Sequence, residues 1–158
     1  MRIFGIGRTG LAALAATALV AGAVLAQDAP FGMQIAARQG MMAYRALNIG
    51  VLAAMAKGEA PYDAAAAQKA ADNLAAQDAL DQSMLWPPGS DNSANPESTA
   101  LAAMWAEGSG IMDKASAYAD AVAAMQAAAG KDLDSLRAAL GPLGGACGDC
   151  HKAFRVAQ

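Results

Sequence analysis

The chain has 158 residues, of which 11 are lysine or arginine and 14 are aspartate or glutamate, giving a formal net charge of −3. This acidic balance argues against nucleic acid or an anionic membrane surface as a partner. Hydrophobic residues make up 56% of the chain and alanine is abundant, which favours helices over strands.

Residues 1–26 have the pattern of a secretory signal peptide. Arg2 and Arg8 supply a positive start, residues 11–25 form an apolar run, and the end of that run fits a small-residue cleavage site. A membrane anchor is the alternative, but the run is shorter than the roughly 20 residues that span a bilayer. We therefore predict export and a single mature domain, residues 27–158, which is more acidic because the two arginines are lost.

Two helices are expected in the first half of the mature domain. The first is predicted to run from about Phe31 to Lys57 and to stop at Gly58, a C-terminal glycine signal. Asp63 suits the N-cap of the second, which is predicted to run to about Leu85. A loop dense in proline, glycine, serine and asparagine follows.

Two further helices are expected in the second half. Asn95 is expected to cap the third, with Pro96 at its first position and its end near Gly130, and Asp132 is expected to open the fourth. Pro142 lies inside the fourth helix, where it either kinks or breaks it; the apolar pattern keeps its phase across the proline and favours a kink. Apolar residues alternate in steps of three and four, which predicts an all-α, antiparallel up-down-up-down four-helix bundle. This seam consists of Leu101, Met104, Gly108, Ile111, Ala115, Tyr118, Val122 and Met125 in the third helix, and of Leu133, Leu136, Leu140, Leu143, Cys147, Cys150 and Phe154 in the fourth.

Both cysteines and the single histidine lie within five residues, Cys147-Gly-Asp-Cys150-His151. C-x-x-C-H is the attachment signature of a c-type haem, in which two thiols add to the porphyrin vinyl groups and the next imidazole can bind the iron. A zinc site would lack ligands, a thioredoxin-like site expects a preceding strand, and a disulfide would close a very small loop. Because both cysteines continue the apolar stripe of the fourth helix, we expect the haem in the bundle core near that helix.

A four-helix bundle with C-x-x-C-H near its C-terminus resembles the cytochrome c′ family. The resemblance covers essentially the whole mature chain and is carried by four short motifs. These are Cys147-Gly-Asp-Cys150-His151-Lys-Ala-Phe154-Arg155, Arg38-Gln39-x-x-Met42, the turn Trp86-Pro87-Pro88-Gly89 after the second helix, and Trp105 near the start of the third.

The resemblance implies one haem c attached through Cys147 and Cys150, with His151 as an axial ligand of the iron. Arg155 follows His151 by four residues, so the two project from one helix face. In the family this arginine lies near the imidazole, and a nearby cation disfavours the protonated ring.

Further cofactor-binding residues are implied by the matching motifs. Arg38 is the candidate partner of a haem propionate, and Arg45 is a competing candidate on the same helix stripe. Gln39 lies beside Arg38 in its motif, and Trp86 could pack on the porphyrin or belong to the ordinary core.

The resemblance leaves two possible roles for Met42. In a low-spin branch of the family, a methionine here binds the sixth position of the iron, and thioether ligation favours electron transfer. In typical members the iron is five-coordinate and high spin, and this residue would be an apolar gate over a face that binds nitric oxide or carbon monoxide. Met41 lies about 100° from Met42 on a helix, so at most one of them can face the iron.

We therefore predict a c-type cytochrome of the periplasm of a Gram-negative bacterium that carries electrons and has redox proteins as partners. The alternative is a haem protein that binds nitric oxide or carbon monoxide. An enzyme such as a peroxidase is not predicted, because no second histidine is present for acid–base work at the distal face. The resemblance also implies a homodimer formed through the first two helices, as in several members of the family. The acidic charge and the cleaved signal predict neither nucleic acid nor a membrane as a partner of the mature chain.

Overall fold

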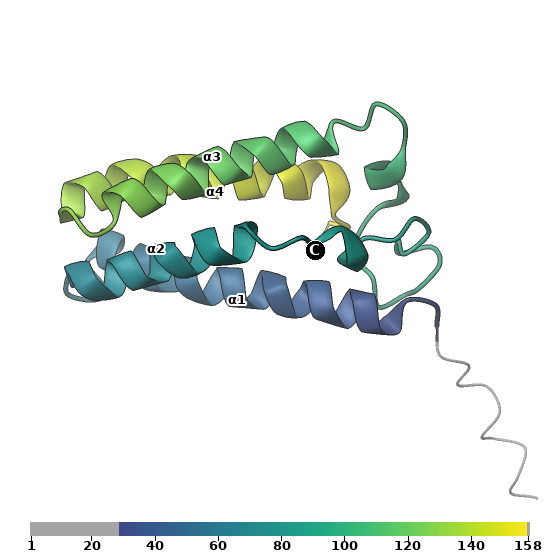
Figure 1. Cartoon of the computed structure of the whole chain (residues 1–158), viewed down its shortest axis with the longest axis horizontal. Helices are drawn as coiled ribbons and strands as arrows, with labels where there is room; N and C mark the ends of the chain where they lie inside the picture. Colours follow the sequence, from purple (N-terminus) through teal and green to yellow (C-terminus); the bar gives the residue numbers. More distant parts are fainter. Residues whose placement is uncertain (1–28, 158) are drawn as a thin grey trace, which may run out of the picture.

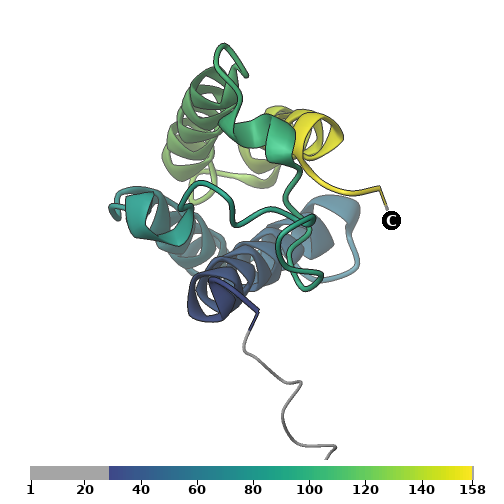
Figure 2. The same ribbon diagram turned by 90° about the vertical axis from the view of Figure 1, so that its right-hand side faces the viewer.

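The fold is a four-helix bundle with the predicted up-down-up-down order. A computed structural model describes residues 29–157, so the predicted signal peptide lies outside the described part. The helices α1 and α2 form one layer and α3 and α4 the other, and an end-on view places the four at the corners of a square (Figures 1 and 2). The helices are α1 Gly32–Lys57, α2 Ala64–Asp78, α3 Ile111–Ala128 and α4 Leu133–Phe154, with two short 3-10 turns, η1 Ser83–Leu85 and η2 Ala102–Trp105.

Three helix ends lie where the sequence predicts them. Gly58 ends α1 with a φ of 77°, a left-handed conformation that glycine adopts without strain. The carboxylate of Asp63 accepts hydrogen bonds from two backbone N–H groups in the first turn of α2, and that of Asp132 accepts one from Ser135 at 2.7 Å. These caps satisfy donors that a helix start otherwise leaves free.

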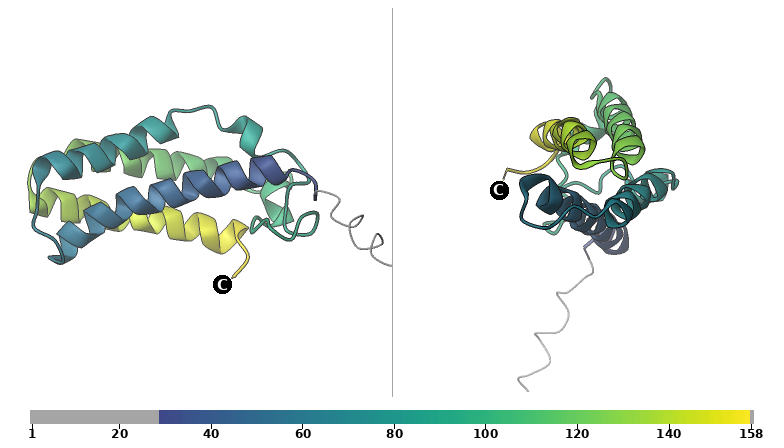
Figure 3. Two further views of the ribbon diagram at one scale, coloured as in Figure 1. Left: turned by 90° about the horizontal axis from the view of Figure 1, so that it is seen from below. Right: turned by 90° about the vertical axis from the view of Figure 1, so that its left-hand side faces the viewer.

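The main aliphatic core occupies the half of the bundle that holds the connections between α1 and α2 and between α3 and α4, away from η1 and η2. Leu52, Leu74, Met125, Leu136 and Leu143 are each fully buried there, and each buried side chain of this size contributes about 2 kcal/mol of transfer free energy. The chain beyond Leu143 in α4 is only partly buried until Phe154. Thus the C-terminal half of α4 leads away from the aliphatic core, beside the N-terminal half of α1 (Figure 3).

The prediction that the second helix reaches Leu85 is wrong, because α2 ends at Asp78. The side chain of Gln82 folds back and donates to the carbonyl oxygen of Gln77 at 3.1 Å, which satisfies a carbonyl of the last turn. Asp81 accepts a hydrogen bond from the backbone N–H of Ser83 and starts the separate turn η1. Local side-chain bonds therefore compete successfully with continuation of the helix.

The predicted start of the third helix at Asn95 is also wrong, because α3 begins at Ile111. Residues 79–110 form a long connection, here called the crossover loop, which covers the end of the bundle where α4 finishes (Figure 1). Within it, Asn95 caps only a local turn, accepting from the N–H of Glu97. The backbone N–H of Leu101 donates to the carbonyl of Phe154 at 2.9 Å, so pairing with the end of α4 replaces helix formation. Three members of the predicted seam, Leu101, Met104 and Gly108, therefore lie outside α3.

The helix α4 runs without a break through Pro142 from Leu133 to Phe154. The alternative that this proline divides the segment into two helices is therefore wrong. Within residues 29–157, none of the helices is long and apolar enough to span a membrane.

Candidate functional site

The two thiols project from the face of α4 that turns toward the bundle interior. Cys147 and Cys150 are free and half-buried, and Cys147 packs against the aliphatic core. Burial raises the pKa of both thiols, while the guanidinium of Arg45 acts in the opposite direction on each of them. Lys114 also lowers the pKa of Cys150. The thiols thus lie one helical turn apart, on one side of a region that contains at least one cation.

His151 follows directly on α4, and its side chain is accessible. Partial burial of the imidazole lowers its pKa, and the nearby charge of Arg155 lowers it further. The neutral imidazole is the form that binds a metal ion, so both influences keep the ring available as a ligand. Arg155 therefore lies near the imidazole, and its own backbone N–H donates to the carbonyl of His151 at 3.0 Å.

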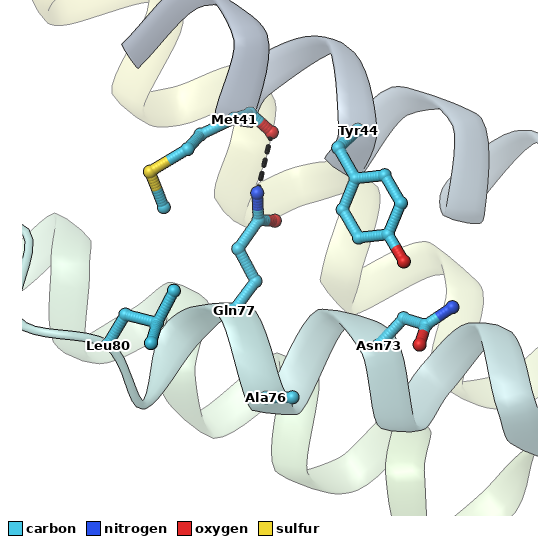
Figure 4. Close-up of a pocket in the computed structure, with 6 residues that line it drawn as sticks. All are labelled: Met41, Tyr44, Asn73, Ala76, Gln77 and Leu80. Atoms are coloured by element: carbon cyan, nitrogen blue, oxygen red, sulfur yellow. Dashed lines mark hydrogen bonds between the residues drawn. The ribbon is translucent and has the colours of Figure 1, made fainter. Parts of the chain in front are cut away.

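The neighbouring methionines of α1 face different surroundings. Met41 lines a groove of about 360 Å³ between α1 and α2, together with Tyr44 and Leu80 (Figure 4). The sulfur of Met42 instead lies 3.8 Å from Nη1 of Arg45. Because Arg45 extends into the bundle interior, toward which the thiols project, Met42 lies on the thiol side of α1. The groove at Met41 lies on an adjacent face of α1, about 100° away, and its lining residue Gln77 also accepts a hydrogen bond from Arg45.

Arg45 and Tyr118 meet inside the bundle, between α1 and α3. Cζ of Arg45 lies 4.7 Å from the centroid of the Tyr118 ring, a cation–π distance. The hydroxyl of Tyr118 is buried and has no hydrogen-bond partner among the described residues. Sequence reasoning missed Tyr118 as a site residue, since its place in the apolar seam of α3 is also that of an ordinary core residue.

Arg38 is buried, with 3% of its surface exposed, and fastens α1 to the crossover loop. Nη1 donates to the hydroxyl of Ser90 at 2.7 Å and to the carbonyl of Leu85 at 3.4 Å. Nη2 donates to the carbonyl of Ser90 and to the hydroxyl of Ser98 at 2.6 Å. Burial lowers the pKa of Arg38, and Asp91 partly offsets this. Four of its five N–H donors thus have acceptors within the chain, and its role as a propionate partner stays a prediction.

The remaining predicted binding residues also contact the crossover loop. Gln39 donates to the carbonyl of Glu97 at 2.7 Å. The ring of Trp86 lies against the guanidinium of Arg38, and its carbonyl accepts the indole N–H of Trp105 at 3.0 Å. The structure therefore brings the predicted residues together in two groups, one at the loop and one beside the thiols.

The group beside the thiols fits a covalently attached haem. Cys147 and Cys150 supply two thiols on the interior face of α4, and His151 supplies a neutral nitrogen at the next position. Across the interior, the sulfur of Met42 is a second soft donor on α1. The hydroxyl of Tyr118, unpartnered among the described residues, adds a polar atom on the ring that the guanidinium of Arg45 covers.

Comparisons with known proteins match almost the whole described chain to one family. A family model described as Cytochrome C' matches residues 33–155. The chain is 46% identical to cytochrome c-554 from Cereibacter sphaeroides over 145 residues, covering 90% of this chain and 95% of the relative. It is 42% identical to a solved cytochrome c′ from Rhodobacter, with a TM-score of 0.78 and coverage of 81% and 98%. It is also similar to the nitric oxide complex of a cytochrome c′ variant from Alcaligenes xylosoxidans, at 30% identity, a TM-score of 0.71 and coverage of 81% and 97%.

Proposed function

Because this chain belongs to the cytochrome c′ family, we propose that it carries electrons through the iron of its covalently attached haem c. When bound, the haem supplies one-electron chemistry at its iron. Cys147 and Cys150 would hold the group, His151 would bind the iron from α4, and Met42 would supply a further iron ligand from α1. This is a carrier and not an enzyme.

The observation that carries this proposal is the placement of Met42. Its sulfur lies beside Arg45 on the thiol side of α1, whereas Met41 lines the groove against α2. A thioether ligand raises the reduction potential and leaves no open position for small ligands, which suits electron transfer.

A second function is the binding of nitric oxide or carbon monoxide at an open iron. It is favoured by the accessibility of Met42, which is 36% exposed and so is not locked in place by packing. A relative from Alcaligenes xylosoxidans has been solved as a nitric oxide complex of a variant. In this alternative Met42 is a gate over the distal face.

The optical spectrum of the purified holoprotein separates the two functions. The spectrum is recorded in oxidised and reduced forms, with and without carbon monoxide, for the native chain and for Met42→Leu. Met41→Leu is the matched control, because it makes the same substitution one residue away on a different face of α1. The carrier predicts a low-spin native spectrum that carbon monoxide does not change.

In the carrier, Met42→Leu becomes high spin and binds carbon monoxide, and Met41→Leu behaves as the native chain does. A high-spin native spectrum that shifts with carbon monoxide contradicts the carrier and supports the gas-binding function. A low-spin spectrum that survives Met42→Leu contradicts Met42 as the ligand.

We also propose export to the periplasm and assembly into a homodimer through α1. Tyr44, Leu47 and Val51 recur at helical spacing on one face of α1 and are 45%, 70% and 42% exposed. Leu80, 60% exposed, lines the adjoining groove beside α2. A second copy of this helix face would cover the stripe, since an exposed apolar row of this kind is typical of an interface.

Sedimentation of the holoprotein tests the homodimer. Leu47→Glu places a charge in the centre of the stripe and is expected to convert a dimer to a monomer. Met112→Glu, at a 75% exposed position on α3, is the control and leaves the dimer intact. A native chain that sediments as a monomer at all concentrations contradicts this assembly.

A further inference from the structure

Arg45 places a positive charge beside the sulfur of Met42, and no described residue forms an ion pair with it. It lies on α1 one turn after Met42, and its guanidinium extends into the bundle over the ring of Tyr118. Nη1 lies 3.8 Å from the sulfur of Met42. The other two nitrogens donate to side-chain amide oxygens, Nε to Gln77 at 3.3 Å and Nη2 to Gln82 at 3.2 Å.

The two glutamines are themselves held in place. The amide nitrogen of Gln77 donates to the carbonyl of Met41 at 2.9 Å, which is the dashed bond in Figure 4. The amide nitrogen of Gln82 donates to the backbone carbonyl of Gln77 at 3.1 Å. Because each amide nitrogen is used elsewhere, each amide oxygen is directed at Arg45. The guanidinium is therefore fixed by neutral acceptors on α2 and on the turn that follows it.

No carboxylate neutralises this cation in the part of the chain that the structure describes. The ion pairs found there are Lys57–Glu59, Arg137–Asp134 and Lys152–Asp149. Asp78, the last residue of α2, is close enough to raise the pKa of Tyr118 but makes no ion pair with Arg45. The charge of Arg45 lies on the interior side of α1, toward which the thiols of α4 project, since its guanidinium lies over the ring of Tyr118.

We propose that Arg45 raises the reduction potential of the haem iron, as a cation that no carboxylate of the described chain compensates and that two glutamine oxygens fix against the sulfur of Met42. The inference rests on the haem attachment proposed above, but it does not require Met42 to be a ligand. A fixed cation disfavours the ferric state, which carries one more positive charge than the ferrous state. An N–H group directed at a thioether also withdraws electron density from it, so the contact acts in the same direction when Met42 binds iron.

Two substitutions test the charge in different ways. Arg45→Gln removes the cation, whereas Gln77→Glu keeps the arginine and gives it a carboxylate partner. At a fixed ambient potential, we expect each to lower the ratio of reduced to oxidised haem by about tenfold, which is 59 mV for a one-electron couple. Arg45→Lys keeps the charge and is expected to retain most of the native potential.

The measurement is a spectroelectrochemical titration of the holoprotein. Arg137→Gln is the control, because it removes an exposed cation of α4 whose charge is screened by solvent, and it leaves the potential unchanged. Circular dichroism confirms that each variant is folded, and if Arg45→Gln does not fold, Gln77→Glu still tests the charge.

The outcomes separate this inference from the proposed function. If Arg45→Gln and Gln77→Glu both keep the reduction potential of the native chain, the proposed role of Arg45 is overturned, even where a low-spin spectrum supports the carrier. A high-spin native chain contradicts the carrier, but lowered potentials in the two variants still support the role of Arg45. A chain that attaches no haem under conditions that mature other c-type cytochromes overturns both.

Discussion

The guanidinium of Arg38 lies over the ring of Trp86, with Cζ 4.7 Å from the ring centroid, and joins α1 to a loop about fifty residues further along the chain. An arginine suits this place because it stacks on an aromatic ring while its planar donors satisfy several acceptors at once. The contact holds the crossover loop against the end of the bundle at which α4 finishes.

Replacing Arg38 by methionine is expected to lower the free energy of unfolding by about 2–4 kcal/mol, because it leaves buried oxygens of Ser90 and Ser98 without their charged donor. Denaturant unfolding of the holoprotein measures the change. Arg137→Met is the control at an exposed arginine, which loses one solvent-exposed hydrogen bond to the carbonyl of Ala56, and we expect a loss of about 1 kcal/mol or less there. Equal losses at both positions would contradict the role of Arg38 as a fastening for the loop.

Asp132, the N-cap of α4, is expected to make the free energy of unfolding depend on pH in the acidic range. Its hydrogen bonds with Ser135, first from the backbone N–H and then from the hydroxyl, lower the pKa of the carboxyl below 3.8. A lowered carboxyl pKa means that the stabilisation is complete above the ordinary pKa and is lost as the pH falls through the folded-state value.

Two substitutions at Asp132 separate capping from titration. Asp132→Asn keeps an oxygen that can cap the helix but cannot titrate, so its stability relative to the native chain should improve as the pH falls below about 3.8. Asp132→Ala loses the cap and is less stable at neutral pH. Thermal unfolding across this pH range measures both effects, and a constant difference between the native chain and the asparagine variant contradicts the assignment.

Tyr118 and Tyr62 are expected to respond in opposite ways to loss of their hydroxyls. The hydroxyl of Tyr118 is buried without a partner, so Tyr118→Phe should leave the free energy of unfolding unchanged or raise it by about 1 kcal/mol. Tyr62 donates to the carbonyl of Ala129 at 2.8 Å, so Tyr62→Phe should lower it. Denaturant unfolding compares the two, and a loss at Tyr118 would indicate a partner outside the described residues.

Tyr118 also predicts a dependence on alkaline pH. Burial, with smaller contributions from Cys147 and Asp78, raises its pKa to about 12. Since the unfolded chain releases this proton at about 10, the native chain should lose stability as the pH rises from about 10 to about 12. In Tyr118→Phe this part of the loss should be absent.

The parts of the fold that the sequence predicted well are those with complete local signals. In α4, Asp132 at the start and an apolar residue at every third or fourth position specify a helix that the structure confirms. The crossover loop differs because its partners are distant in sequence. Ser98 binds Arg38 across sixty residues, and Leu101 pairs with the end of α4, so long-range contacts override the helix that the sequence between Pro96 and Ile111 predicts.

The residues of the candidate site also divide into those that a local motif identifies and those that only long-range contacts bring together. Cys147, Cys150 and His151 are adjacent in the chain, so one motif identifies them. The amide oxygens that hold Arg45 come from Gln77 and Gln82, and neither residue carries a sequence signal because its role depends on where α2 ends.

Replacing glycine by alanine is expected to have opposite effects on stability at Gly58 and at Gly145. Gly58 has a φ of 77°, which costs a residue with a Cβ atom about 1 kcal/mol, so Gly58→Ala should lower the free energy of unfolding by about that amount. Gly145 lies in the interior of α4, is exposed, and has no atom within 4 Å of the place that a Cβ would occupy. Gly145→Ala should therefore raise the free energy of unfolding by about 0.5–1 kcal/mol, because alanine favours the helix. Denaturant unfolding of both variants checks the pair, and a stabilising effect at Gly58 would contradict the left-handed end of α1.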